Sequence, residues 1–286
     1  PTWHNNKAGT PLMGGLMFIF AVILCLVGNL GSMKDYTVFY VLALSLCFGL
    51  VGFLDDFCKV KYKRDLGLTA LQKAMLQMAV SAVYLYVLYR EGTLTCDIYV
   101  PFFNVTFYVH PLVYIFFAMF VMVGCVNAVN LTDGIDGLSS SVTIPVMVFF
   151  TAAAYAMGKS DLALLPAALA GGLIAYLFYN FHPAKVFMGD TGSLFMGGVV
   201  CAMAFALDMP LVLIFAGFVY IVETLSDIIQ VTYFKLTHGK RIFKMAPIHH
   251  HFEMCGWKEE KIVFVFAGVS AIMCVVAWLS IAGKIG

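Results

Sequence analysis

The sequence contains few charged residues for its length. They make up 12% of its 286 residues, about half of the ~25% found in a typical soluble domain. The two signs nearly balance, with 17 Lys and Arg against 16 Asp and Glu, so the chain has no basic excess for binding nucleic-acid phosphates. The hydrophobic share of 62% excludes a disordered chain and a cytosolic enzyme. The composition therefore predicts a polytopic membrane protein.

Neither the cysteine spacing nor residues 1–11 indicate a secreted, disulfide-linked protein. Five of the eight Cys lie inside apolar runs, where Cys behaves as a small hydrophobic residue. The spacings match no zinc motif, and residues 1–11 do not resemble a signal peptide.

Continuous apolar runs predict an all-α fold with nine transmembrane helices, because about 20 apolar residues cross a bilayer. The runs are much longer than the ~10-residue alternating segments of a membrane barrel. The predicted spans cover residues 12–30, 37–54, 70–89, 111–130, 138–157, 161–179, 193–207, 210–233 and 262–282. An alternating stretch at 95–107 predicts a small β-hairpin. The chain shows no repeat, and residues 1–286 are expected to form one domain.

The connecting segments predict the orientation in the membrane. If residues 1–11 are cytoplasmic, segments 55–69, 131–137, 180–192 and 234–261 lie on the same side, and together they carry most of the Lys and Arg. The positive-inside rule places these segments in the cytoplasm and the hairpin outside.

Five aspartates gather on the predicted cytoplasmic side. A single Asp there could simply mark a helix end, but carboxylates at a membrane are costly and five of them favour a functional site. The adjacent pair Asp55 and Asp56 offers what a divalent cation or a shared proton needs. The others are Asp133, Asp136 and Asp190.

Three further motifs surround these acids. Asn127–Leu138 combines glycines with Asn and Asp oxygens, but it lacks the twelve-position pattern of an EF-hand. In Asn180–Ser193, Asp190 precedes a predicted helix start whose free N–H groups favour a phosphate. Pro247–Glu253 contains three consecutive His that cannot all face one metal, so contacts to a phosphate are expected instead of a zinc site.

The eighth predicted span carries polar residues on one face. Glu223 and Asp227 lie four residues apart, and Gln230 follows about one turn later. This face should point into the helix bundle. Structural hydrogen bonds to a neighbouring helix and a role in the functional site are two alternative explanations for these polar residues.

In this order and on this side, the motifs resemble the phospho-N-acetylmuramoyl-pentapeptide transferase family of the polyprenyl-phosphate N-acetylhexosamine 1-phosphate transferase superfamily. The Asp55–Asp56 pair, Asn127–Leu138 and Phe187–Ser193 resemble superfamily motifs, whereas Lys7–Gly15 and Pro247–Glu253 select this branch. The family has ten spans, and its first helix is absent from this sequence. Leu12 stands where the family commonly has Thr.

The resemblance implies transfer of phospho-MurNAc-pentapeptide from its UDP carrier to undecaprenyl phosphate, with release of UMP and with Mg²⁺ as cofactor. The site would lie on the cytoplasmic side of the bacterial inner membrane. Asp190 is expected as first metal ligand with Asp56 nearby, and Asp55 as the group that activates the lipid phosphate. Direct attack by that phosphate and a covalent aspartyl intermediate both remain open.

Substrate contacts are expected from a larger set, with Phe187 stacking on uracil. The set is Lys7, Lys73, Asn130, Asp133, Asp136, Asn180, Phe187, Gln230, His249 and His250. The oligomeric state stays open, with a homodimer as one option.

Two alternatives remain. A sister transferase acting on UDP-N-acetylglucosamine is disfavoured by the triple-His segment. A transporter would explain Glu223 and Asp227, but its site should lie at the bilayer midplane between repeated halves.

Overall fold

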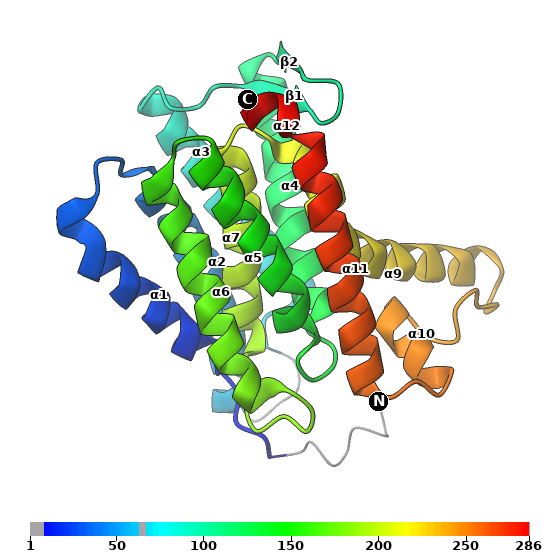
Figure 1. Cartoon of the computed structure of the whole chain (residues 1–286). Coiled ribbons are helices and arrows are strands. Elements are labelled where there is room, and N and C mark those ends of the chain that lie inside the picture. Colours follow the sequence, from blue (N-terminus) through cyan, green and yellow to red (C-terminus); the bar gives the residue numbers. More distant parts are fainter. Residues whose placement is uncertain (1–8, 63–66, 286) are drawn as a thin grey trace.

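Long helices run side by side between two ends of the molecule in the computed structural model, which describes residues 9–62 and 67–285 (Figure 1). One end carries a β-hairpin and is called the hairpin end. The other gathers the segments 67–69, 133–137 and 181–188 and is called the loop end.

Eight of the described helices are long and apolar enough to cross a membrane. They are α1 (Gly15–Asn29, continued by the 3₁₀ turn η2, Leu30–Ser32), α2 (Thr37–Tyr62), α3 (Ala70–Arg90), α4 (Pro111–Thr132), α5 (Leu138–Ala156), α6 (Ser160–Asn180), α7 (Gly189–Ala206) and α11 (Glu259–Ser280). The predicted class, an all-α polytopic membrane protein, is confirmed.

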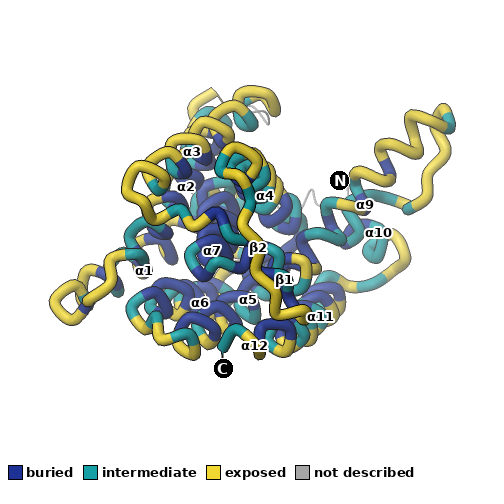
Figure 2. The backbone as a smooth tube through the Cα atoms, turned by 90° about the horizontal axis from the view of Figure 1, so that it is seen from above, coloured by how far each residue is buried: buried dark blue, intermediate teal, exposed yellow. Residues whose placement is uncertain are grey.

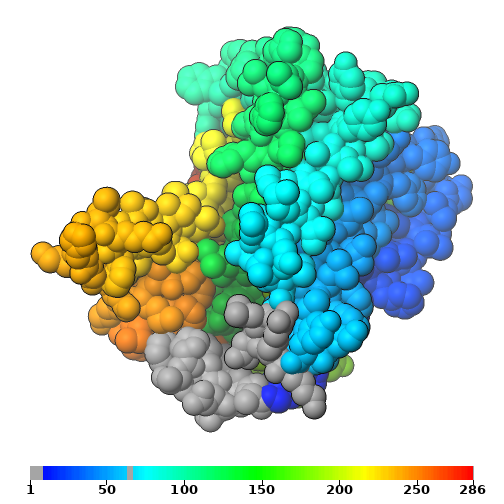
Figure 3. Space-filling model, turned by 180° about the vertical axis from the view of Figure 1, so that it is seen from behind, coloured from blue at the N-terminus to red at the C-terminus, as the bar shows by residue number. Residues whose placement is uncertain are grey.

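The predicted span at 210–233 is a bent pair of segments. The turn η3 (Pro210–Val212) and the short α8 (Leu213–Ala216) lead to α9 (Phe218–Leu236), which turns by 82° after Gly217. Helix α9 projects sideways from the other helices (Figures 1 and 3). Glu223 and Gln230 on its buried face bond to α10 (Ile248–Met254) and to the segment before α10. Hydropathy alone does not detect such polar contacts, so the sequence predicted this apolar run as a span without the bend.

The hairpin is present where it was predicted. Strands β1 (Asp97–Val100) and β2 (Val105–Tyr108) pair antiparallel, with Asp97 opposite Tyr108. The Phe102 N–H donates to the carbonyl of Ser280 at the end of α11, at 2.8 Å. The hairpin and the short α12 (Ala282–Ile285) therefore close the end of the molecule opposite the loops (Figure 1).

Helix α7 lies in the middle of the bundle. Every residue from Thr191 to Phe205 is buried, and Figure 2 shows α7 enclosed by its neighbours. Small residues allow close contact, because a β-carbon at Gly198 would lie 2.8 Å from the Cα of Ser45 on α2. The helix begins at Gly189, four residues before the predicted start at 193, and so brings Asp190 into its first turn.

Candidate active site

Four helices bring polar side chains together at the loop end, around a cavity of about 390 Å³. Asp55, Asp56 and Lys59 come from the last turns of α2, Lys73 from the first turn of α3, Asn130 from the end of α4, and Asp190 from the start of α7. Helix α2 continues to Tyr62, past the predicted end at 54, so the aspartate pair is helical and its two side chains point about 100° apart.

Three carboxylates meet at this point. Asp55, Asp56 and Asp190 each offer an oxygen within 4.8 Å of the others. Asp55 is 3% exposed and Asp56 is fully buried. Clustered buried carboxylates repel one another unless cations or hydrogen-bond donors compensate them.

Asp56 holds the beginning of α7. Its carboxylate accepts the N–H groups of Asp190 (3.2 Å) and Thr191 (2.9 Å) and the Thr191 hydroxyl (2.7 Å). These N–H groups are among those that a helix start leaves without an intrahelical partner. Asp56 therefore fixes Asp190 relative to α2, and it explains why α7 starts earlier than its apolar run.

Two lysines balance the carboxylates. The Lys59 ammonium lies 2.6 Å from Asp55 Oδ2, 3.3 Å from Asp190 Oδ2 and 3.7 Å from Asp56 Oδ1. Lys73 bonds to the same Asp190 oxygen. Lys59 thus occupies the position between the acids where a bound cation would also be attracted.

An asparagine completes the contacts of Asp190. Asn130 donates to Asp190 Oδ1 at 3.1 Å and lies 2.7 Å from the Ser193 hydroxyl, one turn along α7. Side chains from three other helices, α2, α3 and α4, therefore contact Asp190 and orient it.

The segment between α4 and α5 forms another wall of the cavity. Asp133, Gly134, Ile135 and Asp136 all line it. Burial raises the pKa of Asp133 to about 8, and the nearby carboxylates of Asp190, Asp56 and Asp136 contribute to the rise. Asp133 can therefore hold a proton near neutral pH in the protein alone.

The end of α6 supplies Asn180 and the segment after it supplies Phe187 to the same cavity. Asn180 accepts the Gly137 N–H at 3.2 Å and donates to the Val186 carbonyl at 3.0 Å. Its amide thus joins the walls on either side. Phe187 is half-buried and lines the cavity.

The described part of the Lys7–Gly15 motif packs against this wall. The Gly14 N–H donates to the Phe187 carbonyl at 2.8 Å, and the Phe187 N–H donates to Pro11. A β-carbon on Gly15 would lie 2.3 Å from the Gly192 Cα, so the starts of α1 and α7 touch only because both residues are glycines. Lys7 lies outside the described residues.

His249 is buried behind the cavity wall. Its Nδ1 lies 2.9 Å from Glu223 Oε2, and both side chains are fully buried. Its Nε2 has no partner in the described structure and faces Gly134, where a β-carbon would lie 2.2 Å away. The missing side chain at Gly134 makes room for this imidazole.

The remaining predicted contacts lie around α10. The Gln230 amide accepts the N–H groups of Ile242 and Phe243, at 3.1 and 3.0 Å, and donates to the Phe243 carbonyl at 3.1 Å. His250 pairs with Glu253. Among the described residues that line the cavity, neither Gln230 nor His250 appears. Gln230 therefore holds the segment before α10.

The sequence thus indicated most of the residues that gather here. The cavity brings together Asp56, Asp190, Asn130, Asp133, Asp136, Asn180 and Phe187, while Asp55 and Lys73 touch Asp190 or its partners. Lys59 was not selected, although its position four residues after Asp55 on one helix was a usable signal. His182 and Glu259, which contact Asp136, were also missed.

Comparisons with known proteins show which family the chain belongs to. Residues 38–208 match the family described as glycosyl transferase family 4. The chain is 46% identical over 282 residues to the phospho-N-acetylmuramoyl-pentapeptide-transferase of Clostridium acetobutylicum, covering 98% of this chain and 87% of that protein. It is 48% identical over 284 residues to the protein of the same name from Clostridium perfringens strain 13, with coverage of 98% and 87%. A third similar protein of that name, from Clostridium novyi, is 44% identical over 281 residues, with coverage of 98% and 86%.

Proposed function

The chain belongs to glycosyl transferase family 4, among the phospho-N-acetylmuramoyl-pentapeptide transferases, and on that premise we propose its full reaction. It transfers phospho-MurNAc-pentapeptide from the UDP carrier to undecaprenyl phosphate and releases UMP, with Mg²⁺ as cofactor. The observation that carries the proposal is the group of three carboxylates and two ammonium groups that converge beside the cavity at one end of a membrane-spanning bundle.

The residues present fit a magnesium ion. The three acids offer only carboxylate oxygens, grouped within 4.8 Å, and Mg²⁺ prefers oxygen ligands. Asp190 and Asp56 would hold the ion, with Asp55 beside them. When bound, Mg²⁺ would offset the negative charge that accumulates as one phosphate approaches a pyrophosphate.

The chain's own groups supply the rest of the reaction. The ammonium groups of Lys59 and Lys73 add positive charge beside Asp190. Asp55 is held by Lys59 and by the Leu68 N–H at 2.8 Å, so its orientation is fixed. We assign it to take the proton from the lipid phosphate at a carboxylate oxygen, which frees that phosphate to attack.

The nucleotide would occupy the walls formed by Asn130–Asp136, Asn180 and Phe187. Phe187 offers an aromatic face for uracil, and Asn130 and Asp133 offer polar groups beside the acids. Lys7, His249 and His250 remain proposed contacts for the phosphate or sugar. For His249 this contact requires that the Gly134 wall moves, because the imidazole is buried in the protein alone.

The acceptor lipid has a suitable surface nearby. A cavity of about 430 Å³ between α4 and the bent pair is lined almost wholly by apolar residues, among them Phe120, Gly124, Ile221 and Leu225. An apolar isoprenoid chain can lie there while its phosphate reaches the loop end. The excess of Lys and Arg in segments 55–69 and 234–261 of the sequence supports a cytoplasmic active site in the bacterial inner membrane.

One assay tests the proposal and separates it from the alternatives. Purified protein with Mg²⁺ and undecaprenyl phosphate should release UMP from UDP-MurNAc-pentapeptide and not from UDP-N-acetylglucosamine. Asp190→Asn should lower the rate at least about 100-fold, whereas Asp97→Asn at the hairpin end should not. Equal use of both UDP-sugars, or near-normal UMP release from Asp190→Asn at saturating Mg²⁺, would refute the assignment.

A further inference from the structure

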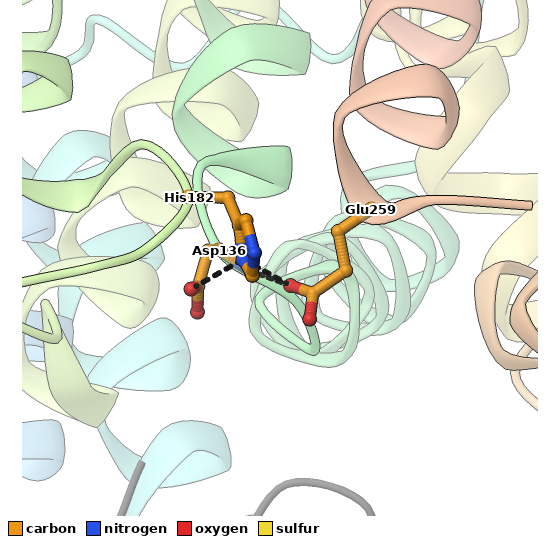
Figure 4. A group of neighbouring side chains, drawn as sticks. All are labelled: Asp136, His182 and Glu259. Atoms are coloured by element: carbon orange, nitrogen blue, oxygen red, sulfur yellow. Dashed lines mark hydrogen bonds and ion pairs between the residues drawn. The ribbon is translucent and has the colours of Figure 1, made fainter. Parts of the chain in front are cut away.

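A second polar cluster lies directly behind one wall of the cavity. It joins Asp136 from the segment between α4 and α5, His182 from the segment between α6 and α7, and Glu259, the first residue of α11. Figure 4 shows the imidazole between the two carboxylates. Of these three residues only Asp136 lines the cavity in the described structure.

Both the side chain and the main chain of Asp136 are held. Its Oδ2 accepts the Ala184 N–H at 2.9 Å and lies 3.2 Å from His182 Nδ1. Its backbone N–H donates to Glu259 Oε2 at 3.3 Å, and the same oxygen lies 3.5 Å from His182 Nδ1. Because that nitrogen faces two carboxylate acceptors, it is the one that carries a hydrogen.

Glu259 is itself well placed to act as an anchor. It lies in the first turn of α11, where free N–H groups and the helix dipole stabilise a carboxylate. Helix α11 packs along α5. The cluster therefore connects the cavity wall to a helix that is packed into the bundle.

We propose that Glu259 and His182 are positioning residues that hold the Asp136 wall in the geometry needed for the nucleotide part of the substrate. This inference rests on the proposed function. They act through Asp136, so their loss should weaken nucleotide binding without affecting the lipid acceptor or the carboxylates around Asp190.

The test compares two neighbouring glutamates in full-length protein. Glu259→Ala should raise the KM for the UDP substrate and the Kd for UMP about tenfold, with kcat and the KM for undecaprenyl phosphate changed less than about twofold. Glu259→Gln keeps an oxygen for the Asp136 N–H and should recover most of the UMP affinity. Glu260→Ala removes the same charge from the same helix turn and should behave as wild type. UMP binding is measured by calorimetric titration.

The outcomes are distinguishable. Unchanged UMP affinity in Glu259→Ala, or equal loss in Glu260→Ala, overturns the positioning role while the proposed function stands. Wild-type protein that neither releases nor binds UMP overturns both. If Glu259→Ala does not fold, the pair His182→Ala and His182→Asn decides the question, because Asn keeps a donor near the Nδ1 position and should bind UMP more tightly than Ala.

Discussion

Replacing Lys59 by Met should make the stability of the protein depend on a divalent cation. The Lys59 ammonium lies within 3.7 Å of an oxygen of each of the three clustered acids. Without it, Asp55, Asp56 and Asp190 face one another, and among the described residues Lys73 is the cation that remains on Asp190. Their mutual repulsion then has to be overcome on folding.

The magnitude follows from the contacts. Two unit charges about 4 Å apart interact by about 4 kcal/mol at an effective dielectric constant of about 20, and breaking a buried ion pair costs about 3–5 kcal/mol. Lys59 is 28% exposed and Lys73 remains, so we expect a loss of about 2–3 kcal/mol. For a chain of this size that loss lowers Tm by roughly 4–10 °C.

Magnesium should restore most of this loss, because a cation bound at about 100 times its Kd stabilises the folded state by about 2.7 kcal/mol. Thermal unfolding in detergent, followed by tryptophan fluorescence with EDTA or with Mg²⁺, measures both effects. Lys61→Met, on the exposed face of the same helix end, is the control. The reasoning fails if both variants melt alike in EDTA, or if Mg²⁺ raises Tm equally in wild type and Lys59→Met.

Three shorter predictions concern the same end of the molecule. Gly52→Ala should destabilise the protein and reduce activity at least tenfold, because its β-carbon would lie 2.1 Å from the Asp190 carbonyl oxygen; Gly124→Ala, with open space around it, should melt as wild type. In EDTA, thermal stability should fall as pH rises from about 4 to 8, because the pKa of Asp133 is raised in the folded protein and its carboxyl group gives up the proton less readily there than in the unfolded chain. This fall should be smaller in Asp133→Asn. Asp55→Asn should lose turnover yet bind UMP normally. Failure to bind UMP, or residual turnover with an unchanged pH profile, would show that Asp55 is not the activating group.

The membrane spans were predictable because bilayer thickness sets a minimum length for each apolar run. The ends of the helices were harder to predict from the sequence. Helix α2 continues to Tyr62 past Asp55 and Asp56, since these acids are compensated by Lys59 and by the start of α7. Hydropathy counts such charges as the end of a span, whereas the folded chain pairs them.

The site was predictable in part for a similar reason. Motifs of Asp and Asn identify groups that a ligand needs, and Asp190 and Asn130 do meet. The residues that orient those groups leave little local trace, because their partners are distant in the chain. Glu259 reaches Asp136 across 123 positions, and no spacing rule connects two residues so far apart.

The central position of α7 also has a consequence for the order in which the protein is built. The helices α1, α2, α4 and α5 that contact α7 all precede it in the chain. During synthesis, α7 therefore enters the membrane after the walls around it have been made. Its 18 residues include Asp190 and several glycines and would be poorly suited to lipid alone, but the capping carboxylate of Asp56 and the amide of Asn130 are already present to receive its first turn. The helix that carries the central acid of the site is thus the one whose insertion depends most on its neighbours.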